Sequence, residues 1–348
     1  MKRAVTIGGI ALPSLSFFRK AIKYMSFRGM FDTIDLVHKR SGKCRPWVFC
    51  DVVWCGLRYG AGYGDYRLCG FENLTGAQRR TYVTRGSNNK LVSLLNDPAY
   101  DSIFDDKTQF NAVFHDFVGD RGWLDLRRES REKAVEFLKS HPVIMAKPAD
   151  GTGGKQVEKI TVSDYAAPEE IYDKLKKNGQ NLVEGYLIQH HELSRMYPLA
   201  VNTLRIVTVL TEGESHVIYA FIRIGNGGAA VDNLHSGGLC APIDIDTGII
   251  THVGYDRDEN TFEVHPYTGT PIVGFHIPFW KESLELCLRA AHVVPQVGYV
   301  GWDVCVTENG PVLIEGNNYP GNDILQMPPH VPDKMGMLPR FKQYVKGL

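Results

Sequence analysis

The sequence lacks an excess of charge of either sign. Its 348 residues include 39 Lys or Arg and 39 Asp or Glu. Proteins dedicated to nucleic-acid binding are usually basic, so this balance argues against that class. The charges are unevenly placed, because residues 1–48 hold ten Lys or Arg and only two Asp. Attraction to an anionic surface is therefore expected at the N-terminal end of the chain.

Paired cysteine spacings are also missing. The chain has seven cysteines, and the first four, Cys44, Cys50, Cys55 and Cys69, lack the short paired spacings of a zinc site. We therefore expect reduced thiols in the protein core.

No apolar run is long enough to span a bilayer. Residues 4–18 follow Lys2 and Arg3 as in a signal peptide, but Gly, Ser and Pro13 interrupt the run and no clear cleavage site follows. We expect a cytoplasmic protein. Residues 16–31 mix Phe, Met and Ile with basic residues at roughly helical spacing. Such a helix either lies on an anionic membrane surface or packs on the protein's own core.

Several well-known signatures fail on inspection. The glycines of residues 58–70 neither follow a strong strand nor open a helix, so we predict a loop and not a dinucleotide site. Lys155 lacks the following Ser or Thr of a Walker loop, and Arg195 stands where a zinc protease needs its second histidine. No Ser-His or Cys-His arrangement indicates a covalent nucleophile.

Regular elements are predicted mainly from residue 127 onward. A strand ends at Lys147, and further strand patterns occur in the later half. We expect helices over 127–139, 167–177 and 278–292, and strands over 155–161, 181–193, 201–210 and in 217–238.

A glycine loop follows the strand that ends at Lys147. It consists of Gly151, Thr152, Gly153 and Gly154 and leads back into a second strand. Glycines let backbone N–H groups approach an anion closely, and the lysine adds a positive charge. The pattern is typical of phosphate binding, although a flexible surface hairpin would look similar.

Polar residues interrupt the later strands. Arg205 and Arg223 stand in apolar strand patterns and need an anionic partner, either a structural salt bridge or a bound phosphate or carboxylate. A final hairpin carries Asp303 on one strand and Glu315 and Asn317 on the next. Residues two apart in a strand share a face, so these oxygens can converge as ligands for Mg²⁺.

Taken in order, these motifs resemble the ATP-grasp superfamily, with Lys107 in DDKTQF and Glu184 in NLVEGYL completing the set. NTLRIVT, GWDV and LIEGNNYPG resemble its sugar-transfer-associated branch, which is related to RimK-type glutamate ligases. The resemblance covers about residues 100–325. It implies an α+β fold in which two subdomains, 99–190 and 191–348, grip ATP with largely antiparallel sheets. Residues 1–98 precede them and lack a Rossmann-like pattern.

The resemblance also implies residue roles. Lys107 and Lys147 would hold the α- and β-phosphates, and the 151–154 loop would close over the triphosphate. Glu184 and the backbone near Leu187 would contact adenine, and Glu192 the ribose. Asp303, Glu315 and Asn317 would bind one or two Mg²⁺ or Mn²⁺ ions. Arg205, Arg223 and Asn233 would face the γ-phosphate and the acceptor.

The implied activity is that of an ADP-forming carboxylate–amine ligase that uses ATP and Mg²⁺ and proceeds through an acylphosphate. The branch name suggests attachment of an amino acid to a sugar-derived or cell-surface metabolite. A phosphotransferase and a non-catalytic ATP-binding module are the alternatives. Residues 1–31 would either give weak contact with the inner membrane surface or pack on the enzyme near its acceptor site.

Overall fold

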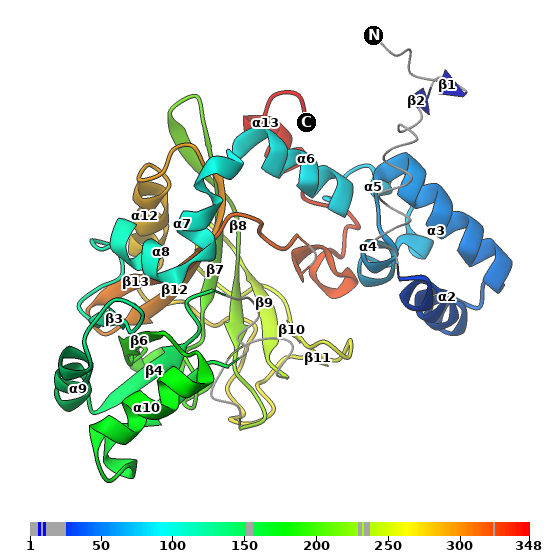
Figure 1. Ribbon diagram of the computed structural model, residues 1–348. Coiled ribbons are helices and arrows are strands. Elements are labelled where there is room, and N and C mark those ends of the chain that lie inside the picture. Colours follow the sequence, from blue (N-terminus) through cyan, green and yellow to red (C-terminus); the bar gives the residue numbers. More distant parts are fainter. Residues whose placement is uncertain are drawn as a thin grey trace. The chain divides into compact units, whose positions relative to one another are not determined.

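The computed structural model describes residues 26–150, 156–228, 232, 237–322 and 324–348. It also describes two short antiparallel strands, β1 (Thr6–Ile7) and β2 (Ile10–Ala11). The predicted glycine loop, Asn233 and most of the segment 16–31 lie outside the described residues. The chain divides into two compact units, one made of Met1–Leu91 and Asn322–Leu348 and the other of Val92–Gly321 (Figure 1).

Apart from β1 and β2, the regular elements described in the first unit are helices. Its helices are α2 (Phe27–Ser41), α3 (Arg45–Tyr59), α4 (Tyr63–Leu68), α5 (Gly76–Arg79) and α13 (Leu338–Tyr344), and the unit boundary falls within α6 (Arg85–Leu95). Ser26 caps α2 by accepting the Gly29 N–H (3.1 Å), and Gly42 ends it in the left-handed conformation. Apolar residues of α2 and α3, including Ile34, Val37 and Val48, form the core.

The prediction of a loop over residues 58–70 is wrong at Tyr63–Leu68, which form helix α4. Asp65 accepts the Gly62 N–H (2.8 Å) at the start of this helix, and Tyr66 is fully buried. Burial of one aromatic side chain and a satisfied N-terminus therefore outweigh the poor helix propensity of the glycines. None of the seven cysteines, all of which are described, forms a disulfide, but Cys44 and Cys50 are exposed, so the expectation of core thiols is wrong for these two.

The second unit contains a four-stranded antiparallel sheet in the order β3-β6-β4-β5. Its strands are β3 (Trp123–Asp125), β4 (Val143–Lys147), β5 (Glu158–Thr161) and β6 (Leu182–Gly185). Helices α9 (Arg131–Ser140) and α10 (Pro168–Asn178) pack on the face that carries Ile144, Ala146 and Val183. Strand alternation places Met145 and Glu184, which are paired in register, on the other face.

A seven-stranded antiparallel sheet, in the order β11-β10-β9-β8-β7-β12-β13, forms the rest of the core. Its strands are β7 (Leu204–Thr211), β8 (Glu214–Ile224), β9 (Leu239–Ile243), β10 (Gly254–Tyr255), β11 (Thr261–Phe262), β12 (Tyr299–Thr307) and β13 (Gly310–Asn317). The helices α7 (Asp101–Asp105), α8 (Lys107–Val113), α11 (His191–Met196) and α12 (Trp280–Ala290) contribute side chains to the same core.

Alternation along this sheet separates its core from its polar residues. Ile206, Ile222, Trp302 and other even-numbered residues of β7, β8 and β12 belong to the core. The odd-numbered Arg205, Arg223 and Asp303 therefore point to the opposite face. That face carries these three of the predicted site residues.

Most predicted elements are confirmed, with shifted ends. Helices α9, α10 and α12 and strands β5 and β7 occupy the expected places. The strand predicted over 181–193 is wrong after Gly185, because α11 begins at His191. Leu193 and Met196 are fully buried at i, i+3 spacing, so the last apolar residue of the predicted strand, Leu193, belongs to a helix. Within the described residues, no helix is both long and apolar enough to cross a bilayer.

Candidate active site

A buried cluster surrounds Glu184 on the four-stranded sheet. Its carboxylate lies 2.6 Å from Lys147 Nζ and 2.8 Å from Arg121 Nη2. The side-chain amide of Asn111, on α8, donates a hydrogen bond to the same carboxylate (2.7 Å). All four residues are less than a tenth exposed. Glu184 thus holds one lysine and one arginine in fixed positions.

The charge of Glu184 is kept by its neighbours. Burial alone would raise its pKa, but the charges of Arg121 and Lys147, with hydrogen bonds from Lys147 and Asn111, lower the pKa to about 2. Glu184 is therefore ionised at neutral pH.

A pH dependence of stability follows from this shift. Glu184→Gln is expected to cost about 3–5 kcal/mol at pH 7, because Lys147 and Arg121 lose their buried counter-ion. A lowered pKa stabilises the folded state above the unfolded value of 4.5, and this stabilisation is lost as the pH falls towards about 2. The free energies of unfolding of the wild type and the variant, measured with urea, should therefore approach each other as the pH is lowered from 4.5 towards about 2. An equal gap throughout would contradict the assignment.

Lys107 begins α8 beside the start of the predicted glycine loop. Asp106 caps the helix by accepting the N–H groups of Thr108 (2.8 Å) and Gln109 (3.3 Å). The Lys107 N–H donates to the carbonyl of Ala149 (2.8 Å). Burial lowers the pKa of Lys107, the nearby carboxylate of Glu315 opposes this, and the charge of Lys147 lowers it further. The two predicted phosphate-binding lysines therefore lie close enough to repel each other.

A second ionic cluster surrounds Asp303 on the seven-stranded sheet. Arg205 contacts both oxygens of Asp303, one of them through Nη2 at 3.0 Å, and Arg223 Nη2 lies 2.7 Å from Oδ2. Arg223 Nε also lies 3.6 Å from Asp232. Burial would raise the pKa of Asp303, but the charges of Arg205 and Arg223 hold it well below its usual value. The anionic partner that the two arginines need is Asp303.

Glu315 lies directly opposite Asp303 in the register of β12 and β13, and the two side chains are hydrogen-bonded. Burial and the charge of Asp303 raise the pKa of Glu315. Asn317, two residues further, donates from Nδ2 to the carbonyl of Gly301 (3.3 Å). Two adjoining carboxylates and an amide oxygen form a hard-oxygen set that needs a proton or a cation between them. These residues fit Mg²⁺.

The cluster also suits an anion. Five cationic side chains, Lys107, Arg121, Lys147, Arg205 and Arg223, are arranged around Glu184, Asp303, Asp232 and the protonatable Glu315. Arg223 Nε is buried and makes no hydrogen bond to the described residues. Excess positive charge beside a hard-oxygen set is suited to a metal-bound polyphosphate.

The sequence of residues 86–344 matches the sugar-transfer associated ATP-grasp family. The chain belongs to this family. Enzymes of the ATP-grasp superfamily are typically ADP-forming ligases that bind ATP and Mg²⁺. A search of curated proteins found no significant match.

Distant similarity to solved structures accompanies the family match. D-alanyl-alanine synthetase A from Vibrio cholerae is 14% identical, with a TM-score of 0.45, and the alignment covers 71% of this chain and 66% of that chain. D-cycloserine synthetase DcsG is 13% identical, with a TM-score of 0.44, and the alignment covers 80% of this chain and 91% of that chain. An L-amino acid ligase from Bacillus licheniformis is 10% identical, with a TM-score of 0.40, and the alignment covers 65% of this chain and 43% of that chain. The chain thus spans less than two thirds of the first and third of these proteins.

Two residues that are expected to contact the nucleotide, Leu187 and Glu192, lie outside the ionic clusters. Leu187 is half-buried in the segment after β6. Glu192 is on α11, where its carboxylate pairs with Arg195 (2.8 Å). Among the described contacts, neither Leu187 nor Glu192 is paired with Lys147, Glu184, Asp303 or Glu315.

Arg121 and Asn111 are site residues that sequence reasoning missed. Asn111 follows Lys107 by four positions on α8, so helical spacing could have placed both on one face. Arg121 lies in a segment between elements with no periodic pattern, and no local signal indicates its burial.

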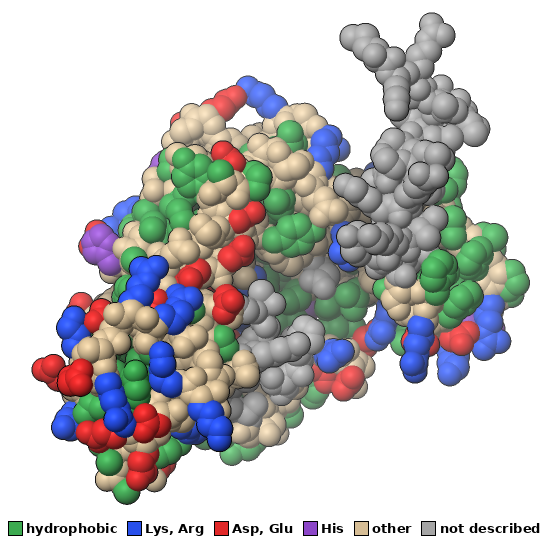
Figure 2. Space-filling view, in the orientation of Figure 1, with side chains coloured by type: hydrophobic (Ala, Val, Ile, Leu, Met, Phe, Trp, Pro, Cys, Tyr) green, Lys and Arg blue, Asp and Glu red, His purple; other side chains and the backbone are tan. Residues whose placement is uncertain are grey.

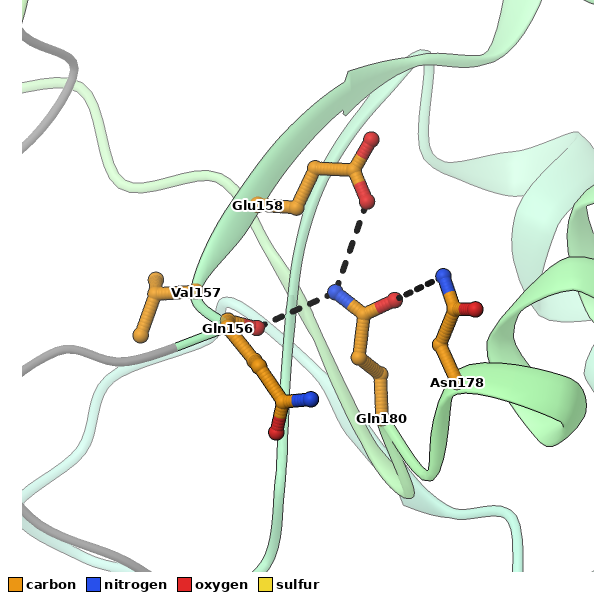
Figure 3. A pocket seen from close by; sticks show the side chains of 5 residues that line it. All are labelled: Gln156, Val157, Glu158, Asn178 and Gln180. Atoms are coloured by element: carbon orange, nitrogen blue, oxygen red, sulfur yellow. Dashed lines mark hydrogen bonds between the residues drawn. The ribbon is translucent and has the colours of Figure 1, made fainter.

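A polar cavity of about 320 Å³ lies where the chain leaves the glycine loop (Figure 3). It is lined by Gln156, Val157, Glu158, Asn178 and Gln180. The Gln180 side-chain amide donates to the Gln156 carbonyl (3.1 Å) and towards Glu158 (3.4 Å). None of the predicted site residues that the structure describes lines this cavity, so we do not assign it to the ATP-grasp chemistry.

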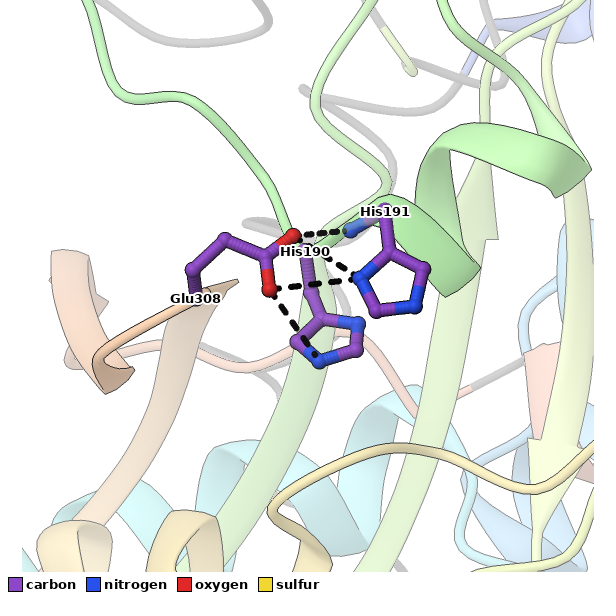
Figure 4. Close-up of side chains that lie close together, drawn as sticks. All are labelled: His190, His191 and Glu308. Atoms are coloured by element: carbon purple, nitrogen blue, oxygen red, sulfur yellow. Dashed lines mark hydrogen bonds and ion pairs between the residues drawn. The ribbon is translucent and has the colours of Figure 1, made fainter.

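His190, His191 and Glu308 form a separate cluster in which candidate ligand atoms lie within 4.8 Å of one another (Figure 4). The backbone N–H of His191 donates to Glu308 Oε1 (2.7 Å), and its Nδ1 lies 3.0 Å from the same oxygen. His190 Nδ1 accepts the Glu192 N–H (3.2 Å). These hydrogen bonds tie the start of α11 to the β12–β13 turn and account for the arrangement without a metal ion.

Proposed function

We propose that this protein is an ATP- and Mg²⁺-dependent carboxylate–amine ligase that forms an acylphosphate. The observation that carries the proposal is the pair of adjoining carboxylates, Asp303 and Glu315, set beside five cationic side chains. We further propose that it attaches an amino acid to a sugar-derived or cell-surface metabolite, in the cytoplasm or at the inner membrane surface. Its partners would be ATP, a small acid and a small amine, without nucleic acid.

The residues would divide the work by charge. Lys107 and Lys147 would bind the α- and β-phosphates, with the 151–154 loop over the triphosphate. Asp303, Glu315 and Asn317 would hold Mg²⁺, which when bound neutralises charge on the phosphate oxygens. Glu184 would contact adenine with the backbone near Leu187, and Glu192 would contact the ribose. Arg205, Arg223 and Asn233 would face the γ-phosphate and the acceptor.

The proposed reaction has two steps. An oxygen of the substrate carboxylate attacks the γ-phosphorus, the bond to the β-phosphate oxygen breaks, and ADP leaves. The amine nitrogen then attacks the acyl carbon and releases a proton, and phosphate leaves as the carbon–nitrogen bond forms. Fixed cations lower the barrier by stabilising charge that develops on the transferring group, and no covalent enzyme intermediate is needed.

Lys147→Met tests the nucleotide assignment. Loss of a charge-assisted contact should weaken ATP binding by about 1.5–3 kcal/mol, and calorimetry measures this directly. Glu184 keeps Arg121 and Asn111 as partners in this variant, so the fold should persist. Lys139→Met, at an exposed position on α9, is the matched control and should bind ATP normally. Equal affinities of the two variants would contradict the assignment.

Product analysis tests the reaction class. The protein is incubated with ATP, Mg²⁺ and pooled amino acids and sugar acids, and ADP, AMP and phosphate are followed. A ligase releases ADP and phosphate only when both an acid and an amine are present. ADP formation with a hydroxyl compound alone, accompanied by a stable phosphorylated product, would show a phosphotransferase instead.

A further inference from the structure

Helix α3 has an apolar side that faces solvent. Val48, Val52 and Cys55 point into the core of the first unit. Successive helix positions are about 100° apart, which places another set of side chains together on the outward side. This set, here called the α3 face, consists of Pro46, Trp47, Phe49, Cys50, Val53 and Trp54, all exposed.

The exposure of the α3 face is unusual for this protein. Trp47, Phe49, Val53 and Trp54 are 42%, 39%, 41% and 48% exposed. Sixteen large hydrophobic side chains are exposed among the described residues, and six of them lie on α2 and α3. These two helices are short, with 15 residues each, so the exposed side chains are concentrated there. Figure 2 shows hydrophobic side chains gathered on this part of the molecule. Concentrated apolar exposure of this kind marks a binding surface.

Charged groups surround the α3 face without entering it. Arg45 and Arg58 lie at opposite ends of the face, one on each side of it, and both are exposed. Arg45 also forms a salt bridge with Asp35 of α2 (2.6 Å). Lys43 Nζ lies 4.1 Å from the ring centre of Trp47. Asp51, the acidic residue of α3, is turned away and is bound by Arg79 (2.7 Å) and by the Tyr66 hydroxyl (2.7 Å). The rim of the face, with Lys43, Arg45 and Arg58 against Asp35, is therefore basic in net charge.

We propose that the α3 face docks on the surface of an anionic lipid bilayer. Tryptophan is the side chain that most favours the membrane–water boundary, and arginine and lysine can keep their charges among headgroups while their stems lie against lipid. Anionic lipid attracts the basic rim. The helix is roughly 22 Å long, too short to cross the membrane, so it lies along the surface.

Charge disfavours a second copy of this chain as the occupant. A two-fold pairing of α3 faces would place the net basic rims of the two copies near each other. The acid at the rim, Asp35, is already paired with Arg45 of its own chain (2.6 Å). The sequence-based hypothesis places lipid contact within residues 1–31, of which only 26–31 and two short strands are described. The α3 face is a separate surface, and its docking does not depend on the proposed ligase activity.

Vesicle co-sedimentation of the full chain tests the proposal. The probes are phosphatidylcholine vesicles with and without phosphatidylglycerol, at low and high salt. We expect binding to the anionic vesicles at low salt, a blue shift of tryptophan emission, and release by high salt. The double variant Trp47→Ser, Trp54→Ser should bind anionic vesicles at least about tenfold more weakly than the wild type, because it loses two inserted rings. Leu94→Ser, at a residue 48% exposed on α6, is the matched control and should bind like the wild type.

Three outcomes would overturn the proposal. The first is no binding to anionic vesicles at low salt, and the second is binding that the double variant retains in full. The third is self-association, measured by sedimentation velocity, that the double variant abolishes while vesicle binding is absent. That result would assign the α3 face to a second copy. Circular dichroism of the double variant confirms that its helices are intact, since both rings are largely exposed.

Discussion

Glu315→Gln is expected to reduce ATP turnover by about 100-fold or more while leaving the protein as stable as the wild type, or more stable. In the proposed site the amide would have no charge with which to hold Mg²⁺ beside Asp303, so activity should fall. Stability is kept because Glu315 is a disfavoured carboxylate in the folded state, with its pKa raised by burial and by the charge of Asp303. Gln can still donate a hydrogen bond to Asp303.

The stability difference should depend on pH in a defined direction. An acid whose pKa is raised on folding stabilises the protein below its unfolded pKa of 4.5 and loses that contribution as the pH rises through the folded value. The variant does not titrate at this position. Its advantage over the wild type should therefore grow as the pH increases from about 4.5, as measured by urea unfolding.

The matched control is Glu214→Gln, the same substitution at the exposed start of β8 in the same sheet. It should change neither turnover nor stability. Normal ADP formation by Glu315→Gln would contradict the metal assignment. Loss of activity that accompanies a large loss of stability would instead show that Glu315 has a structural role.

Asp303→Asn is expected to have the opposite effect on stability, with a loss of about 3–5 kcal/mol. Asp303 is 1% exposed and is the shared counter-ion of Arg205 and Arg223. The amide is similar in size but leaves two buried guanidinium groups without a full compensating charge. Activity should be lost as well, because the same residue is a proposed Mg²⁺ ligand.

Denaturant unfolding measures this loss. Asp116→Asn, at a side chain that is 79% exposed, is the control and should change the free energy of unfolding by less than about 0.5 kcal/mol. A variant at Asp303 that unfolds within about 1 kcal/mol of the wild type would show that the two arginines find other partners. Adjacent carboxylates in one β-ladder thus have contrasting expected effects, one functional and one both functional and structural.

The parts of this site that can be predicted from sequence are those with local patterns. The hairpin pattern places Asp303 and Glu315 on neighbouring strands, and the Glu-x-Asn spacing gives Asn317 the same face as Glu315. The strand that ends at Lys147 and the strand pattern with Glu184 are equally local. These patterns are short-range consequences of the strand period, so they can be read without knowing the fold. The bulge between Asp303 and Val304, which sets Glu315 opposite Asp303 while Leu313 faces the core, has no such local signal.

The pairings between distant segments could not be predicted in this way. Asp303 is 98 residues from Arg205 and 80 from Arg223, and the sequence left open whether the arginines bind a protein carboxylate or a ligand. Arg121 reaches Glu184 across 63 residues from a segment without a periodic pattern. The errors at α4 and α11 have a related cause, because burial by tertiary packing decided the structure where local propensity indicated a loop or a strand.

The most direct test of the proposed ligase follows oxygen through the reaction. Once the assay with pooled acids and amines identifies an active pair, the acid is supplied with ¹⁸O in its carboxylate, and the released phosphate is examined by mass spectrometry. An acylphosphate mechanism predicts ADP and phosphate that carries one ¹⁸O atom from each carboxylate consumed, because the carboxylate oxygen that attacks the γ-phosphorus leaves with it. Formation of AMP, or of phosphate without label, would contradict the proposal.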